Sequence, residues 1–379
     1  MAAGEDSDPS CLFMVSAFLA MEPPDVVLSF ARELCGGCIT ESVQSFIWRR
    51  CISKADLKWQ GDYMRRFLKK LIGDIESSGG VVLDELYEQY TSMISLQDGS
   101  TNSGNLWILK TISFLFPDES AGISSCLTSK QFEVRLRCST NMLEGDTGCS
   151  IWPSSLFLSE FILSHPEIFA NKCCFEVGSG AGLIGICLSY VKASKILLSD
   201  GDFSTLANMK FNLELNDLST GDNTSDNLVQ HKKVHCICLP WESATDEELL
   251  GLSPDIILGA DIIYDPSCLP HLIRILAVLL KHKSINSHTH VSDALPADTL
   301  VCANGTGGGP VAYFASVIRN EDTFNYFLAL AEESNLRVTD LTGNVQDASK
   351  QDHLISVENK GVDLVNCRIE RHILFLLGD

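Results

Sequence analysis

The chain has 379 residues, with 28 Lys and Arg against 49 Asp and Glu, and therefore a formal net charge of −21 at pH 7. A chain this acidic repels phosphate backbones, so we expect no nucleic-acid substrate and favour a basic partner such as a lysine-bearing protein surface. Hydrophobic residues make up 45% of the chain, which excludes a largely disordered protein and, at this length, predicts about two domains.

Membrane and metal-binding proteins are also disfavoured. No apolar run reaches the roughly 20 residues needed to cross a bilayer, and the start of the chain lacks the basic segment of a secretory signal. The 15 cysteines are odd in number and scattered through apolar patterns. They predict buried, reduced side chains in a cytoplasmic protein. No second cysteine pair accompanies Cys35 and Cys38 at zinc spacing, so we expect no bound metal. Separately, we expect the protein to be a monomer.

Residues 1–125 are predicted to form a mainly helical domain. Apolar residues recur there at three- and four-residue spacings in four segments, at 26–34, 42–52, 61–72 and 83–93. No catalytic constellation occurs in this part of the sequence. The domain is therefore expected either to dock or stabilise the rest of the chain or to take a direct part in substrate recognition.

Residues 126–379 are predicted to form an α/β domain. A strand at 132–138 and a helix at 155–163 come first, and strand and helix patterns alternate from residue 172 onward. Alternation predicts a doubly wound, seven-stranded, mostly parallel Rossmann-like sheet. Its strands are expected at 173–177, 195–199, 234–239, 256–259, 311–317, 336–340 and 369–377. A polar insert at about 282–310 is expected to be a mobile loop.

A glycine-rich turn after the strand at 173–177 carries the strongest functional signal. Gly178, Ser179, Gly180, Ala181 and Gly182 follow the strand directly, and a helical pattern begins at the next residue. Glycines allow a sharp turn and let a ligand lie against bare main chain, while the first amides of the helix stay free to face it. This arrangement predicts an enzyme with a nucleoside-containing cofactor.

Two cofactors compete for this turn. Gly180, Gly182 and Gly185 match the dinucleotide pattern G-x-G-x-x-G, with Asp200 about 20 residues further on. S-adenosylmethionine (SAM), which carries no phosphate, fits better. Glu176 inside the strand end would repel a pyrophosphate, yet its carboxylate could accept hydrogen bonds from an ammonium or hydroxyl group. Asp200 ends the next strand, where it could accept both ribose hydroxyls.

Four side chains are expected to meet at one edge of the sheet. Glu176, Asp200 and Asp261 each lie at the carboxyl end of a predicted strand. Trp241 follows the strand predicted at 234–239. In open α/β sheets this edge faces the ligand crevice. An acid at a strand end is often only a helix cap, and a Trp after a strand is usually core, but four such residues at successive strands favour a cofactor site.

These motifs resemble the seven-β-strand, SAM-dependent protein methyltransferases that modify lysine. The resemblance lies in an Asp-x-x-Tyr after the fourth strand (Asp261 to Tyr264), in Trp152 and Trp241, in the glycine turn, and in Arg319-Asn320 after the fifth strand. Within this family, the stretch from Leu83 to Glu88 resembles the subgroup of enzymes that methylate translation elongation factor 2, in the version found in plants. The family pattern is broken by Pro153 after Trp152 and by Pro240 before Trp241.

The resemblance implies a role for each matching residue. Contacts to SAM would come from Trp152, Gly178, Ser179, Gly180, Trp241 and Ala260, with Asp200 on the ribose. Asp261 and Tyr264 would line the lysine channel as the catalytic residues. We hypothesise that Asp261 captures the incoming ammonium and orients the amine. Three alternatives stay open: a methyltransferase of another protein or small molecule, an NAD-dependent oxidoreductase, and a SAM-binding module without turnover.

Overall fold

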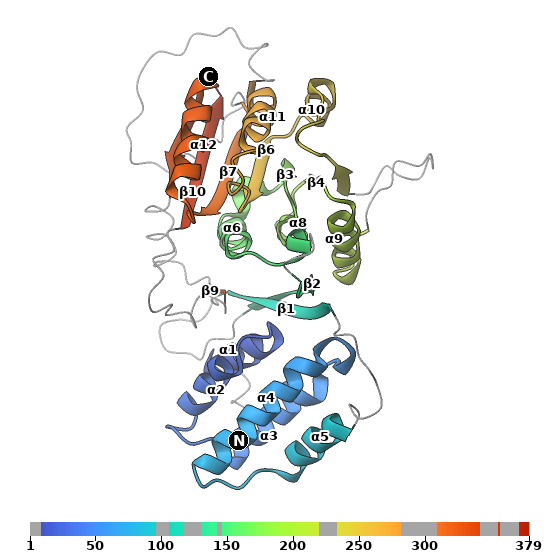
Figure 1. The fold of residues 1–379 in the computed structure, drawn as a ribbon, viewed down its shortest axis with the longest axis vertical. Helices are drawn as coiled ribbons and strands as arrows, with labels where there is room; N and C mark the ends of the chain where they lie inside the picture. The colour runs from blue at the N-terminus through green and yellow to red at the C-terminus, as the bar shows by residue number, and fades with distance from the viewer. Residues whose placement is uncertain are drawn as a thin grey trace. The chain divides into compact units, whose positions relative to one another are not determined.

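The computed structural model describes residues 9–95, 106–116, 130–141, 146–219, 233–281, 309–341, 355–356 and 371–378 (Figure 1). The chain divides into two compact units. The first comprises Met1–Glu144 with Asp352–Asn366, and the second comprises Gly145–Gln351 with Cys367–Asp379. None of the described helices is long and apolar enough to cross a membrane.

The described residues of the first unit form five α-helices: α1 (Pro9–Leu19), α2 (Pro24–Glu33), α3 (Glu41–Arg50), α4 (Leu57–Ser77) and α5 (Asp84–Ser95). The longest, α4, is capped at its start by Asp56, whose side chain accepts a hydrogen bond from the Lys58 amide. Its buried face contributes Phe67, Leu68 and Leu71 to a core shared with the other helices. The four predicted helices are present with shifted ends, whereas α1 was not predicted.

A small antiparallel sheet completes the first unit. Strand β1 (Trp107–Phe116) pairs along its whole length with β2 (Lys130–Ser139), and β9 (Ile355–Ser356) pairs with the other edge of β1. The predicted boundary between residues 125 and 126 separates these two strands. Because the ten-residue register of the β1–β2 pair holds them together, the structure divides the chain at 144/145 instead.

The second unit contains a seven-stranded sheet in the order β5-β4-β3-β6-β7-β10-β8. Its strands are β3 (Cys173–Val177), β4 (Lys195–Asp200), β5 (Val234–Cys238), β6 (Ile256–Ala260), β7 (Val311–Val317), β8 (Leu336–Asp340) and β10 (Arg371–Gly378). The first five are mutually parallel, and β10 runs antiparallel between β7 and β8. The predicted α/β class and its parallel core are confirmed.

Helices cover both faces of this sheet (Figure 1). Adjacent residues of β4 show how, because side chains alternate across a strand. Leu197 joins the core that includes α11 (Leu269–Lys281) and α12 (Glu321–Glu333). Leu198 instead lies against Gly185 of α8 (Leu183–Tyr190). The remaining described helices are α6 (Pro153–Ser164), α7 (Pro166–Phe169), α9 (Phe203–Leu215) and α10 (Asp246–Leu252).

The strands at 173–177, 311–317 and 336–340 have the predicted ends, and the other four predicted strands of the sheet differ by one or two residues. The predicted mobile insert lies outside the described residues, except for Gly309 and Pro310.

Candidate active site

The glycine turn joins β3 to α8 in the left-handed conformation that glycine favours. Gly178, Gly180 and Gly182 have φ values of 68°, 53° and 85°. A Cβ on Gly178 would lie 2.9 Å from Cγ2 of Ile262 and 3.6 Å from Cζ2 of Trp241. Three loops, from β3, β5 and β6, therefore meet at this turn, and a side chain larger than hydrogen would force them apart.

The same turn also touches the segment before α6. A Cβ on Gly180 would lie 3.0 Å from the carbonyl oxygen of Gly148, which follows Thr147 in a 3₁₀ turn. The indole nitrogen of Trp152 donates to the Thr147 carbonyl at 3.0 Å. Trp152 is the residue before α6, so its ring is fixed beside the loop that contacts the glycine turn.

Ser179 fastens the turn to the neighbouring strand. Its amide donates to the Ser199 carbonyl at 2.8 Å, and its hydroxyl accepts from the Ser199 amide at 3.0 Å. Asp200 then accepts from the Gly180 amide at 3.2 Å and from the Asp202 amide at 3.1 Å. A carboxylate has about four acceptor positions, so Asp200 keeps capacity for further donors such as ribose hydroxyls. Burial raises its pKa, and the backbone donors oppose that shift.

Glu176 is a buried acid with an unsatisfied oxygen. It is 2% exposed, and within the described residues its Oε2 atom has no hydrogen-bond partner. Burial raises the pKa of Glu176 well above its ordinary value; the Ser179 side chain opposes the shift and the charge of Asp200 adds to it. A buried carboxyl oxygen without a donor is costly. It fits a bound group that supplies a donor, and an ammonium would supply one.

Asp261 follows β6 in a strained but tightly held conformation. Its φ is 55°, and its amide donates to the Ala315 carbonyl at 2.9 Å. Its carboxylate is 4% exposed and binds both terminal nitrogens of Arg319, at 3.0 and 3.1 Å. The Val317 amide adds a third hydrogen bond at 3.2 Å. Our sequence hypothesis treats this carboxylate as a free acceptor for ammonium, whereas both of its oxygens are occupied.

The remaining predicted residues lie at the same end of the sheet. Ala260 ends β6 and is paired with Ala315 of β7. Tyr264 is 65% exposed, and its pKa is raised by partial burial first and then by the charges of Cys268, Asp265 and Asp200. The ring is therefore largely open to solvent.

Arg319 was not among the predicted site residues, although its position was noted as part of the family resemblance. Its guanidinium carbon lies 5.1 Å from the centroid of the Trp152 ring, so it links Trp152 to Asp261. Arg319 and Asp261 are 58 positions apart in sequence. An arginine shortly after a strand is common, and only the parallel pairing of β6 with β7 brings the two together.

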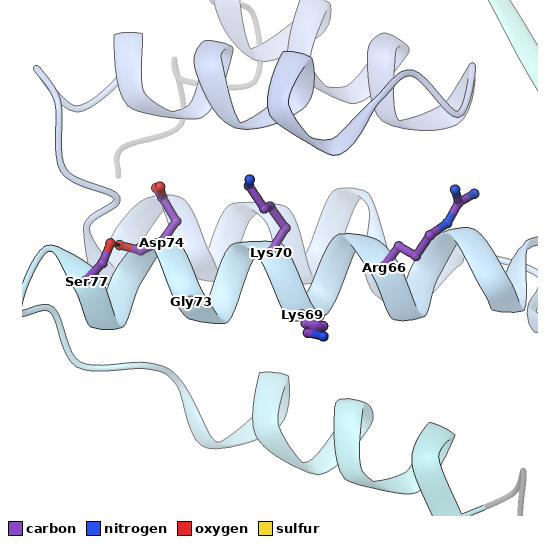
Figure 2. Close-up of a pocket in the computed structure, with 6 residues that line it drawn as sticks. All are labelled: Arg66, Lys69, Lys70, Gly73, Asp74 and Ser77. Carbon is purple, nitrogen blue, oxygen red and sulfur yellow. Dashed lines mark hydrogen bonds between the residues drawn. The ribbon is translucent and has the colours of Figure 1, made fainter.

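A surface pocket of about 450 Å³ lies elsewhere, on α4 of the first unit (Figure 2). It is lined by Arg66, Lys69, Lys70, Gly73, Asp74 and Ser77. Lys70 pairs with Asp25 at 3.0 Å, and Asp74 binds Arg32. The pocket contains none of the predicted site residues, and the pairing of its charges gives no sign of catalytic chemistry. We assign the candidate active site to the sheet edge instead.

Among the described residues, no group of three or more His, Cys, Asp or Glu side chains could hold a metal ion. The sheet-edge site combines the glycine turn with three acids and three aromatic residues at neighbouring strand and helix ends: Glu176, Asp200, Asp261, Trp152, Trp241 and Tyr264.

Residues 130–291 match the sequence model of a family described as lysine methyltransferases. The matched stretch contains every predicted site residue, from Trp152 to Tyr264, and ends before Arg319. The match agrees with the predicted resemblance to lysine methyltransferases and with SAM as the cofactor expected for such enzymes.

Two curated relatives are similar to part of this chain. An uncharacterised protein of Dictyostelium discoideum is 35% identical over 218 residues, covering 53% of this chain and 54% of that protein. The human protein-lysine N-methyltransferase EEF2KMT is 28% identical over 215 residues, covering 56% of this chain and 59% of that protein. The chain thus spans little more than half the length of these relatives.

Likeness to solved structures is weaker. The T. thermophilus 16S rRNA N2 G1207 methyltransferase, in complex with AdoMet and guanosine, is 13% identical with a TM-score of 0.37, covering 73% of this chain and 52% of that one.

Proposed function

We propose that this chain is a SAM-dependent protein-lysine N-methyltransferase and that its substrate is translation elongation factor 2. The observation that carries the reaction class is the match of residues 130–291 to the lysine methyltransferase family, together with the acids and rings gathered at the carboxyl ends of β3 to β6. The seven-stranded order of the sheet, with one antiparallel strand near its edge, is consistent with a Rossmann-like methyltransferase domain.

The residues of the glycine turn fit SAM on two counts. Gly178 and Gly180 hold the turn in the left-handed conformation close to the neighbouring loops, which leaves bare main chain for a ligand, and among the described residues the Oε2 atom of Glu176 is a buried acceptor without a donor. In this proposal Glu176 faces the ammonium of the cofactor, Asp200 binds the ribose hydroxyls, and Trp241 packs near the adenine. Trp152, Ser179 and Ala260 would complete the contacts. When bound, SAM supplies an electrophilic methyl group on a sulfonium.

The reaction requires a neutral lysine amine, because only its lone pair can attack the methyl carbon. A free lysine has a pKa of about 10.4, so keeping it neutral at pH 7 costs roughly 4.6 kcal/mol. A lone carboxylate beside the amine would raise that cost, since it stabilises the ammonium. Arg319 cancels the charge of Asp261, which reduces negative charge around the amine.

Tyr264 is proposed to form the wall of the lysine channel. Its ring is 65% exposed at the rim of the site, where an aliphatic lysine stem could pack against it and lose water. Loss of water lowers the pKa of the amine, and a fixed stem holds the nitrogen in line with the methyl group.

Elongation factor 2 is proposed as the substrate on two grounds: the resemblance of Leu83 to Glu88, and the similarity to a protein-lysine N-methyltransferase named EEF2KMT. In the structure, this stretch lies at the start of α5, with Tyr87 38% exposed. The helical unit that contains it is proposed to dock the substrate or stabilise the catalytic unit. We also propose a cytoplasmic, monomeric enzyme.

Purified chain, radiolabelled SAM and unmethylated elongation factor 2 test this proposal directly. We expect label on the factor with the wild type, none with Asp261→Ala, and undiminished label with Arg337→Gln, because Arg337 is exposed on β8 away from the site residues. Mass spectrometry of the labelled factor identifies the lysine.

Two other outcomes point to the alternatives. Thermal stabilisation by SAM without label would keep the cofactor and discard this substrate. Stabilisation by NAD but not by SAM would contradict the proposal and favour the oxidoreductase.

A further inference from the structure

Arg319 connects two loops that come from distant parts of the sequence. It follows β7, and its terminal nitrogens bind the carboxylate of Asp261 after β6. The same guanidinium lies over the ring of Trp152, before α6. One side chain therefore contacts a proposed channel residue and a proposed cofactor-binding residue at once.

The carboxylate of Asp261 depends on this arginine. It is 4% exposed, so water cannot replace a lost partner easily. Of its hydrogen bonds in the described structure, two come from Arg319 and one from the Val317 amide. An incoming lysine would have to displace a two-pronged guanidinium contact with a single ammonium, which makes fewer simultaneous hydrogen bonds.

Trp152 is held from two directions. Its indole nitrogen donates to the Thr147 carbonyl at 3.0 Å, and the guanidinium carbon of Arg319 lies 5.1 Å from its ring centroid. A planar guanidinium on an aromatic ring is a favourable contact that also restricts the ring. Removing Arg319 would leave the Thr147 bond as the remaining described polar restraint.

We propose that Arg319 is a positioning residue, which holds Asp261 and Trp152 together so that the Asp-x-x-Tyr loop and the Trp152 loop form one rigid side of the cofactor site. Asp261 then serves as the anchor of Arg319 rather than as the acceptor of the substrate ammonium. This inference rests on the proposed function and deepens it, because it assigns the recognition of lysine to the channel wall and not to a free acid.

The geometry of the guanidinium is essential to this role. Lysine at position 319 would keep the charge, yet it offers a single nitrogen and no flat surface for the ring. Asparagine at position 261 would remove the charge while tolerating the φ of 55°, since Asn adopts the left-handed region more readily than most residues. These two substitutions separate charge from geometry without forcing the loops to refold.

Calorimetric binding of SAM to the full chain tests the inference without protein substrate. The variants are Arg319→Gln, Arg319→Lys, Asp261→Asn and the double variant Arg319→Gln/Asp261→Asn, with Arg337→Gln as the exposed-arginine control. We expect each Gln or Asn single variant to weaken SAM binding by about tenfold and the double variant to add less than about twofold, because residues that act as one unit are not additive. Arg319→Lys should recover only part of the loss.

Tryptophan fluorescence supplies an independent readout. The component that Trp152→Phe removes should become more exposed to quenching in Arg319→Gln, with circular dichroism as the check that the variant is folded.

Three results would overturn the inference. The first is unchanged SAM affinity in Arg319→Gln. The second is an Asp261→Asn variant that binds SAM normally and raises only the KM for elongation factor 2, which would restore ammonium capture by Asp261. The third is a loss of SAM affinity in the double variant that equals the product of the fold losses in the two single variants. Failure of the wild type to bind SAM at all would contradict the proposed function itself, and is thereby distinguished from these results.

Discussion

Two arginine–aspartate pairs, one in each unit, have the same chemistry and different surroundings. In the first unit, Arg32 of α2 binds Asp74 of α4 through Nε at 3.1 Å and Nη2 at 2.5 Å, and the side chains are 35% and 22% exposed. In the second unit, Arg319 makes an equally two-pronged contact with Asp261, whose side chain is only 4% exposed. The surface pair joins two helices that already share a core.

The Asp261 pair differs because it holds a strained loop and an aromatic ring in place. Burial of the acid, rather than the number of hydrogen bonds, therefore decides how much stability depends on the arginine. Substitutions that change one pair at a time test this conclusion.

The largest effect is expected from Arg319→Gln, which leaves a buried carboxylate without its cation. We expect the free energy of unfolding of the second unit to fall by about 2 kcal/mol, below the roughly 3–5 kcal/mol of a fully buried pair, because the arginine is 42% exposed and solvent screens it. Urea denaturation followed by tryptophan fluorescence measures the change. A loss no larger than that of Arg32→Gln would break the comparison.

Glu176 extends the comparison to a buried acid that pairs with no cation in the described part of the chain. Because its pKa is raised in the folded state, the folded chain binds more protons than the unfolded chain above the ordinary value of 4.5. The free energy of unfolding should therefore decrease as the pH rises from 4.5 through the raised pKa of Glu176. In Glu176→Gln, this pH-dependent decrease should be absent.

We expect the Glu176→Gln variant to be more stable than wild type at pH 8 and close to it near pH 4. Thermal unfolding of the ligand-free chain at both values measures this difference. Parallel melting curves for the two proteins across the range would contradict the raised pKa.

A smaller effect is expected from Arg32→Gln, since both partners of the surface pair can be hydrated. We predict a loss of about 0.5–1 kcal/mol in the stability of the first unit, and a decrease of that loss at high salt. Denaturation of both proteins at low and high ionic strength provides the test. Loss of SAM binding in this variant would show that the pair does more than join α2 to α4.

The smallest effect concerns Gly73, next to Asp74 on α4. A Cβ at this position meets no atom within 4 Å. Gly73→Ala should therefore stabilise the helix by about 0.5 kcal/mol, because alanine loses less backbone entropy than glycine in a helix interior. Gly180→Ala is the matched control and should destabilise, since its φ is 53° and the new Cβ would lie 3.0 Å from the Gly148 carbonyl.

Much of the second unit could be predicted from local sequence patterns. The run Cys173–Val177 followed by glycines predicts strand and turn correctly, since a short apolar segment bounded by glycine has few other solutions. The acids at strand ends could be grouped because parallel strands present their carboxyl ends at one edge. The family resemblance is confirmed, whereas the roles of individual residues stay predictions.

Other features depend on contacts that a local pattern does not contain. The β1–β2 pair was missed because only β2 was recognised as a strand, and a single strand gives no register or partner. The bond between Arg319 and Asp261 spans 58 positions, and the open oxygen of Glu176 depends on what surrounds it in three dimensions. The shared cause is that pairing and burial are set by tertiary packing.

The small sheet of the first unit has a consequence for the order in which the chain can assemble. β9 pairs with β1, yet about 240 residues separate them, and six strands of the large sheet are synthesised in between. During synthesis on a ribosome, one edge of β1 therefore stays unpaired with β9 until most of the second unit has emerged. A fragment that stops at residue 125 would lack β2 as well as β9, and its remaining strand would be exposed on both edges to pairing with other chains.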